Sequence, residues 1–327
     1  MMGKKLLVAV AVWAMFLMSN VQAKPYSYVD MHLHYLNFVQ ETQGFEALLA
    51  KMDEQGVTNC VVFGMPYNIV VNEQSVNNPA YYLSDDSKVF WYPLTDILVM
   101  DDYLKLSPVK QQRIYPFLGG ANTGNKNSAR EMERVLQMYP GKFRGIGELM
   151  FRHDFLTWKA AEPAPLPNSA AADAIFKLAA KHDLPVIIHH NMTSLRSQEP
   201  IYLAELETAL ANNRQTKVIW AHAGQSYYLH VNNLTTIIDK ALAAHPNLYI
   251  DLSWVVLKQD IMQTPDSMKE WAKLLTLYPD RFMIGTDTVG AFENYNIREY
   301  DRLLDLLDDT TARKVARGNF LRLIHEE

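Results

Sequence analysis

The sequence contains very little cysteine: Cys60 is the single one in 327 residues. One cysteine cannot form an internal disulfide, so the chain is not a disulfide-stabilised domain and must depend on a hydrophobic core for stability. Cys60 lies in the apolar run CVVF, where we expect a small buried side chain rather than a catalytic nucleophile.

The chain also lacks an excess of positive charge. Its 31 Lys and Arg are outnumbered by 36 Asp and Glu, which gives a net charge of −5. The sequence shows no basic stripe, so we expect no nucleic-acid partner. It has no linker and no low-complexity tract, and 49% apolar with 20% charged residues is ordinary for a soluble enzyme.

One long apolar run is present, at residues 6–18, preceded by two lysines and followed by the small-residue segment VQA at 21–23. This layout predicts a signal peptide at 1–23 and a mature domain at 24–327, because the run is short for a membrane span. An uncleaved anchor is the alternative. No cysteine stands directly after the run, which argues against a lipoprotein. We therefore expect a periplasmic or secreted protein without a stable membrane anchor.

Beyond residue 24, eight short apolar runs alternate with segments of helical spacing. Such runs predict parallel strands that are buried on both faces. Eight strand-helix units in about 300 residues predict an α/β fold of the (β/α)8 TIM-barrel type, with a doubly wound open sheet as the alternative. Two long loops are expected, at 64–113 and 149–170. The predicted strands span residues 27–34, 57–64, 114–120, 142–149, 184–190, 216–224, 247–254 and 280–287.

Polar residues occur repeatedly at the carboxyl ends of these strands. Asp30, His32 and His34 alternate in the first strand, so we expect them to face the same way. A pair of histidines is weak evidence alone, but four later strands also end in a metal-type ligand. Buried polar groups in apolar strands are costly unless they are paired or bind a metal. The later candidates are Glu148, His189, His222 and Asp287.

The segments DMHLH, GIGE, VIIHH, WAHAG, IGTD and GNFLRLI resemble the amidohydrolase superfamily, specifically its amidohydrolase-related (amidohydrolase-2) branch. The resemblance covers nearly all of the chain after residue 24. It implies a metal-dependent hydrolase in which His222 is either a ligand of a second metal or a polarising group. The metal ligands that it implies are His32, His34, His189 and Asp287.

Glu148 and His190 are left open by the sequence. GIGEL is similar to the GEIGL segment of TatD-type nucleases, so Glu148 could bridge two ions, orient a ligand or pair with Arg152. His190 competes with His189, because neighbours on a strand point to opposite faces and only one can face the barrel mouth. The family pattern favours His189. We expect Asp30 to orient a ligand, and the histidines in loops and helices, among them His153, to have surface or packing roles.

Imidazoles and carboxylates favour zinc, as one ion or two, although manganese, iron or nickel fit as well. The expected reaction is attack by metal-activated water on an amide, ester or lactone carbonyl of a small molecule. Asp287 would accept the water proton, and His222 or a second metal would stabilise the oxyanion. The alternatives are non-oxidative decarboxylation, a non-catalytic exported binding protein, and, less favoured, phosphodiester hydrolysis.

The sequence says little about the substrate. Arg152 and Arg196 are candidates for binding a substrate carboxylate, since arginine forms two parallel hydrogen bonds to such a group. Trp91 belongs to an aromatic-rich segment, residues 81–92, which suggests an apolar or ring-containing ligand. Nothing in the sequence indicates an oligomeric state.

Overall fold

The computed structural model describes residues 26–73, 79–84 and 86–326, so the predicted signal peptide lies outside the described residues. Eight strands form one sheet in the order β1-β3-β6-β7-β8-β9-β10-β11, and all neighbours are parallel. The strands are β1 (Tyr28–Asp30), β3 (Val57–Val62), β6 (Ile114–Leu118), β7 (Gly145–Met150), β8 (Val186–His189), β9 (Val218–Trp220), β10 (Leu248–Asp251) and β11 (Phe282–Met283).

The first and last strands of the sheet meet. The N–H of Met31 donates to the carbonyl of Ile284 at 3.1 Å. Just beyond, β2 (Leu33–His34) pairs in parallel with β12 (Thr288–Val289). This contact closes the sheet, which confirms the predicted TIM barrel and excludes the open doubly wound sheet.

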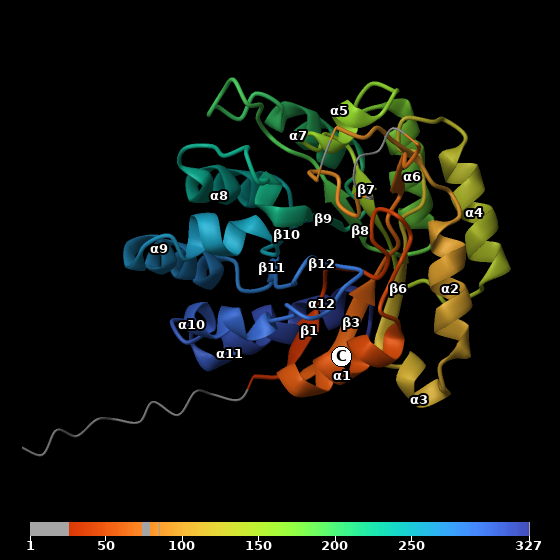
Figure 1. Ribbon diagram of the computed structural model, residues 1–327. Coiled ribbons are helices and arrows are strands. Elements are labelled where there is room, and N and C mark those ends of the chain that lie inside the picture. The colour runs from red at the N-terminus through yellow and green to blue at the C-terminus, as the bar shows by residue number, and fades with distance from the viewer. Residues whose placement is uncertain (1–25, 74–78, 85, 327) are drawn as a thin grey trace, which may run out of the picture.

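Helices surround the sheet on its outer side (Figure 1). No described helix is long and apolar enough to cross a bilayer. The long helices are α1 (Phe45–Gln55), α2 (Thr95–Lys105), α4 (Ser128–Met138), α6 (Ala170–Lys181), α7 (Leu203–Asn212), α8 (Leu234–Ala244) and α9 (Pro265–Leu277); the last part of the chain forms α10 (Asp301–Leu304), α11 (Asp309–Arg313) and α12 (Asn319–Leu323).

The two connections predicted as long loops are partly regular, which corrects the sequence interpretation. Residues 64–113 contain α2, the short helix α3 (Pro108–Gln111) and an antiparallel ribbon of β4 (Tyr67–Ile69) with β5 (Val89–Trp91). Residues 149–170 contain the short helix α5 (Leu156–Lys159). Helix α2 has no side-chain cap, but neither have α1 and α4, which their helical spacing predicted. It was missed because the sequence interpretation treated this whole interval as one loop.

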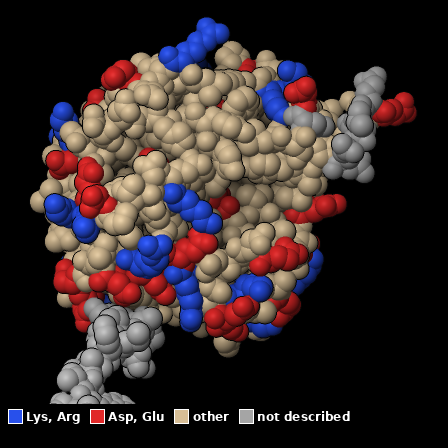
Figure 2. Space-filling view, turned by 60° about the vertical axis from the view of Figure 1, so that its left-hand side comes forward, with Lys and Arg blue, Asp and Glu red and all other residues tan. Residues whose placement is uncertain are grey.

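Charged residues of both signs are mixed on the face shown in Figure 2, where the upper part carries few of them and the lower part many. Blue and red atoms alternate there rather than forming a single blue stripe. On this face the arrangement agrees with the net charge of −5 and offers no phosphate-binding track.

Side chains on alternate strand positions fill the lower barrel. Val61, Ile187 and Ile219 pack inside with Phe320 of α12, whereas Val62 and Ile188 pack outward against the helices. This alternation matters for function, because a histidine two residues after an inward side chain also faces the barrel interior. Apolar side chains thus occupy the bottom of the barrel, and polar ones emerge at its carboxyl end.

Gly147 in β7 is required by its surroundings. Its φ is +127°, and a Cβ placed there would lie 2.4 Å from the carbonyl oxygen of Ile187. Gly147→Ala is therefore expected to lower the free energy of unfolding by about 2–4 kcal/mol, measured by urea titration. The control is Gly318→Ala, whose Cβ would meet Arg313 O at an ordinary 3.7 Å. Equal losses in the two variants would contradict this account.

Candidate metal centre

The six residues that the sequence singled out at the strand ends converge at the carboxyl end of the barrel. They come from five different places on the strand rim, with His32 and His34 from the same one, so the centre exists only once the barrel has closed. Five are at most 3% exposed, and the Asp287 side chain is 10% exposed. The six are His32 and His34 at β2, Glu148 in β7, His189 in β8, His222 in the 3-10 turn Ala221–Gly224, and Asp287 before β12.

Glu148 lies at the middle of the cluster, between two pairs of imidazoles. Its Oε2 is 3.2 Å from His34 Nε2 and 3.6 Å from His32 Nε2. Its Oε1 is 3.1 Å from His189 Nδ1 and 3.4 Å from His222 Nε2. Each carboxylate oxygen therefore serves one pair of rings, the arrangement expected of a carboxylate that can bridge two positive centres.

Asp287 lies on one side of this cluster. Its Oδ1 is 3.4 Å from His32 Nε2 and 3.5 Å from His34 Nε2, and its Oδ2 is 3.9 Å from His222 Nε2. Ligand atoms of three overlapping groups lie close enough to share an ion. These groups are His32, His34 and Glu148; His32, His222 and Asp287; and Glu148, His189 and His222.

Hydrogen bonds on the far side of the rings fix which nitrogen faces the centre. His32 Nδ1–H donates to Asp251 Oδ2 at 2.8 Å, and His34 Nδ1–H donates to the carbonyl of Gly64 at 3.2 Å. The Ser253 hydroxyl donates to Asp251 and so accepts from His222 Nδ1–H at 2.9 Å. In their neutral forms these three rings therefore present unprotonated Nε2 atoms to the centre.

His189 has the opposite arrangement. The amide N–H of Asn191 donates to His189 Nε2 at 3.2 Å, so the ring in its neutral form directs Nδ1–H at Glu148 Oε1. The carbonyl of this amide is held by the N–H of Asp154, which fixes its orientation.

The ionisation of the buried groups favours cation binding. Burial alone would raise the pKa of Glu148, but His32 and the hydrogen bonds from His189 and His222 lower it well below its ordinary value. Burial, together with repulsion from His153, lowers the pKa of His189 to about 3. A carboxylate and a neutral imidazole are therefore present at neutral pH.

The donor set fits a divalent metal. Three imidazole lone pairs point at carboxylate oxygens, and acceptors that face one another at these distances are unfavourable unless a cation lies between them. His32 Nε2 is buried and has no hydrogen-bond partner among the described residues. The carboxylates of Glu148, Asp251 and Asp287 outweigh the effect of burial and raise the pKa of His32 well above its ordinary value. The negative charge around His32 therefore favours a positive charge at this position. Imidazole nitrogens and carboxylate oxygens are ligands for zinc and similar ions.

His189 and His190 point to opposite faces of β8. His189 contacts Glu148, whereas His190 Nε2–H donates to the Tyr202 carbonyl at 3.1 Å and lies outside the cluster. Burial lowers the pKa of His190 to about 4, so it is a neutral packing residue. The strand alternation thus gives a geometric answer to a choice that the sequence left open.

The expectation for Asp30 needs correction. β1 ends at Asp30 and β2 begins at Leu33, so the alternation is interrupted and Asp30 does not share a face with His34. Asp30 instead accepts from the N–H groups of His32 and Thr286. The carboxylate that orients a ring is Asp251.

The predicted substrate-binding residues lie away from the cluster. Arg152 forms two hydrogen bonds of 2.7 Å to Glu205, and its guanidinium lies 3.7 Å from the Tyr202 ring centre. Arg196 is exposed in the segment before α7. Trp91 packs on Tyr67 with ring centres 4.3 Å apart. None of the three predicted residues lines the cavity that holds the cluster.

That cavity has a volume of about 120 Å³, and residues that sequence reasoning missed form its walls. Trp254 stands against His222 with ring centres 5.0 Å apart. His153, expected at the surface or in packing, is buried and stacks on His189 at 3.9 Å. Tyr81 and Tyr82 close another side, in the aromatic-rich segment. Asp251 could have been found, because it too is a charge ending an apolar run, LYID.

Comparison with known proteins gives the family. A search of curated protein sequences finds no significant match. Similar solved structures include a zinc-bound amidohydrolase from Burkholderia multivorans (14% identity, 91% of this chain and 99% of that chain covered, TM-score 0.56). A TIM-barrel protein of Bordetella bronchiseptica is similar (14%, 92% and 99%, 0.56). So is a manganese-bound dihydroxybenzoic acid decarboxylase of Polaromonas (13%, 92% and 97%, 0.53).

At these identities the structural matches support the fold alone. The sequence profile of the amidohydrolase family, by contrast, matches residues 29–325, which is nearly the whole described chain and includes all six residues of the cluster. The chain therefore belongs to the amidohydrolase family, in its amidohydrolase-2 branch.

Proposed function

We propose that this protein is a metal-dependent hydrolase that cleaves an amide, ester or lactone bond in a small molecule. The observation that carries the proposal is the position of Glu148 between two pairs of histidines, with three ring lone pairs directed at its oxygens. Such a set of buried acceptors has a physical explanation if it holds divalent cations.

We propose two ions rather than one. Glu148 Oε2 would serve the ion held by His32, His34 and Asp287. Oε1 would serve the ion held by His222, and His189 would join it as a ligand through Nδ1 after that nitrogen loses its proton. The division of the four rings between the two carboxylate oxygens supports this assignment. Zinc is our first choice for both, because four of the six ligands are imidazoles.

A bound divalent ion would supply Lewis acidity and lower the pKa of a water molecule. The chain's own residues then divide the remaining tasks. Asp287 lines the cavity with a side chain that is 10% exposed, and it would accept a proton and return it to the leaving group. Asp251 and Ser253 would hold the His32 and His222 rings in position. Trp254, Tyr81 and Tyr82 would limit the access of bulk water.

The cavity favours a neutral carbonyl over a carboxylate-bearing substrate. Among its described lining residues there is no lysine or arginine, and Arg152 is engaged by Glu205. A decarboxylase has to bind a substrate carboxylate, and here only the proposed ions could hold it. The lack of a second cationic group in the lining therefore supports hydrolysis. Export, proposed from residues 1–23, would put the activity in the periplasm or outside the cell.

The test joins metal analysis to product analysis. Purified protein should contain about two divalent ions per chain, and chelation should lower turnover at least about a hundredfold, with recovery on adding Zn²⁺. The substrates are phenyl acetate, δ-valerolactone and N-acetylated amino acids in H₂¹⁸O, with 2,6-dihydroxybenzoate as the competing class. Hydrolysis places ¹⁸O in the acid product.

Two results would reject the proposal. Release of CO₂ from 2,6-dihydroxybenzoate without ¹⁸O uptake from any ester, lactone or amide would identify a decarboxylase. Absence of bound metal together with no metal-dependent turnover would identify a non-catalytic protein.

A further inference from the structure

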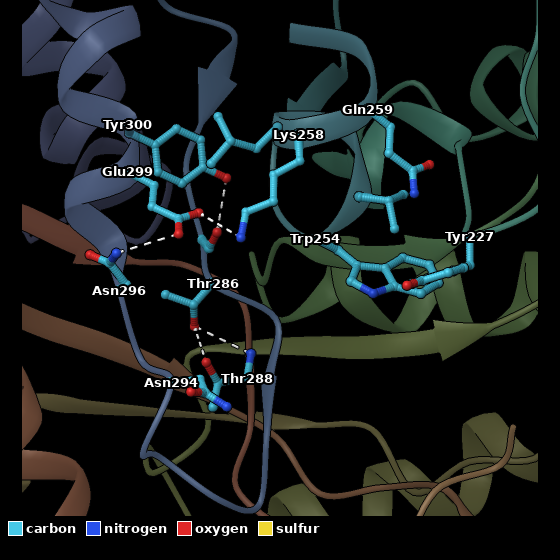
Figure 3. Close-up of a pocket in the computed structure, with 13 residues that line it drawn as sticks. Tyr227, Trp254, Lys258, Gln259, Thr286, Thr288, Asn294, Asn296, Glu299 and Tyr300 are labelled. Carbon is cyan, nitrogen blue, oxygen red and sulfur yellow. Dashed lines mark hydrogen bonds and ion pairs between the residues drawn. The ribbon is translucent and has the colours of Figure 1, made fainter. Parts of the chain in front are cut away.

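A second cavity, which we call the side pocket, shares Trp254 with the cavity of the metal centre. Figure 3 shows the residues that line it. It lies between the turn η2 (Leu257–Ile261) after β10 and the turn η3 (Ile297–Tyr300) after β12. Its volume is about 350 Å³, against about 120 Å³ for the cavity with the cluster. The larger of these two cavities therefore lies next to the metal centre and does not contain it.

Trp254 and the segment around Asp287 form walls of both cavities. Trp254 lines both, with His222 at 5.0 Å and Tyr227 of the side pocket at 6.4 Å between ring centres. Thr286 and Thr288, the neighbours of Asp287, line the side pocket. A molecule reacting beside Asp287 therefore has the side pocket one residue away, and the cluster cavity alone is too small for most metabolites.

The polar groups of the side pocket are mainly uncharged, and three of them are amides. Gln259 and Asn294 make no side-chain hydrogen bond to any described residue, and Figure 3 shows Gln259 beside Trp254 and Asn294 beside Thr288. Asn296 is partly used, since its Nδ2–H donates to Glu299 at 3.4 Å. An amide offers both donors and an acceptor, so these side chains suit hydroxyl groups, which also do both.

The charged groups of the side pocket compensate each other. Lys258 Nζ lies 3.2 Å from Glu299 Oε2, and these two carry the only full charges among the described lining residues. An ionic ligand would find no unpaired charge of opposite sign in the pocket. A neutral ligand does not need one. The aromatic faces of Trp254 and Tyr227 add an apolar surface on one side.

We propose that the side pocket binds a neutral, hydroxyl-bearing ring that forms the non-reacting part of the substrate. Its C–H face would lie on Trp254 and Tyr227, and its hydroxyls would bind Gln259 and Asn294. The assignment of this ring to the substrate rests on the proposed function. The binding of the ring to the side pocket does not.

The first experiment measures binding without turnover. Saturation-transfer NMR with methyl β-D-glucopyranoside should show saturable binding, and sodium benzoate should show none that depends on this pocket. The double variant Gln259→Ala/Asn294→Ala should weaken binding of the glucoside about tenfold, because two hydrogen bonds are lost. The matched control is Asn212→Ala/Gln215→Ala, which removes an exposed pair at the end of α7 and should change nothing.

The second experiment asks whether the bound ring lies near the metal centre. With Mn²⁺ loaded, the glucoside protons should relax faster than with Zn²⁺, because the paramagnetic ion acts only over short distances. No saturable glucoside binding, equal weakening in both double variants, or pocket-dependent binding of benzoate would overturn the proposal. So would binding without faster relaxation when analysis finds Mn²⁺ in the protein. If neither Zn²⁺ nor Mn²⁺ binds while the glucoside does, the proposed function fails and the pocket assignment stands.

Discussion

Glu148→Gln is expected to abolish metal retention and turnover together. The substitution keeps the size of the side chain but removes the charge that lies between His32, His34, His189 and His222. The amide would also replace one carboxylate oxygen by an N–H₂ group, which cannot bind a cation held by the neighbouring pair of rings. Metal affinity should fall by more than the roughly 100-fold that loss of a supporting group costs, because Glu148 contacts the ions directly.

Metal content by elemental analysis and kcat/KM measure this effect, and circular dichroism checks the fold. The matched control is Glu131→Gln, the same change at an exposed position in the first turn of α4, which should keep both properties. If Glu148→Gln keeps its metal and a tenth or more of its turnover, Glu148 is not a ligand.

Asp287→Asn is expected to separate metal binding from catalysis. Asparagine keeps an oxygen that can face the cluster, and His32, His34 and Glu148 would still hold the ions, so metal content should change little. It cannot accept a proton, so kcat should fall by about 10²- to 10⁴-fold, the usual contribution of a general base. KM should change much less, because the substrate-binding walls are intact.

The readouts are kcat, KM and metal content of the same preparation, with Asp266→Asn at the exposed start of α9 as control. Full loss of metal would show that Asp287 acts chiefly as a ligand. Unchanged kcat with full metal content would move the proton-transfer role to another group, with His153 in the cavity wall the first to test.

The repeated placement of charges at the ends of apolar runs was sufficient to predict the barrel and the six residues of the cluster. This worked because each choice depends on local rules. Apolar runs between amphipathic segments indicate buried parallel strands, and an imidazole or carboxylate at the end of such a run needs a partner. The same reasoning extends to Asp251, which is a charge in the same kind of position.

Other features depend on side chains that are distant in the sequence. Arg152 stands close to the strand end that carries Glu148, yet Glu205 of α7, on the next strand-helix unit, takes its hydrogen bonds. His153 looked like an ordinary loop residue until the barrel brought it onto His189. Helix α2 buries apolar side chains such as Val99 and Tyr103, in an interval that the sequence interpretation treated as a loop.

The sequence by itself therefore determined the fold and which residues reach the rim, since strand alternation and burial are properties of short segments. The tertiary structure decided which nitrogen of each ring faces inward, that Glu148 lies between two pairs of histidines, and that an uncharged side pocket adjoins them. Those depend on contacts such as His32 with Asp251, 219 residues apart, which no local pattern encodes.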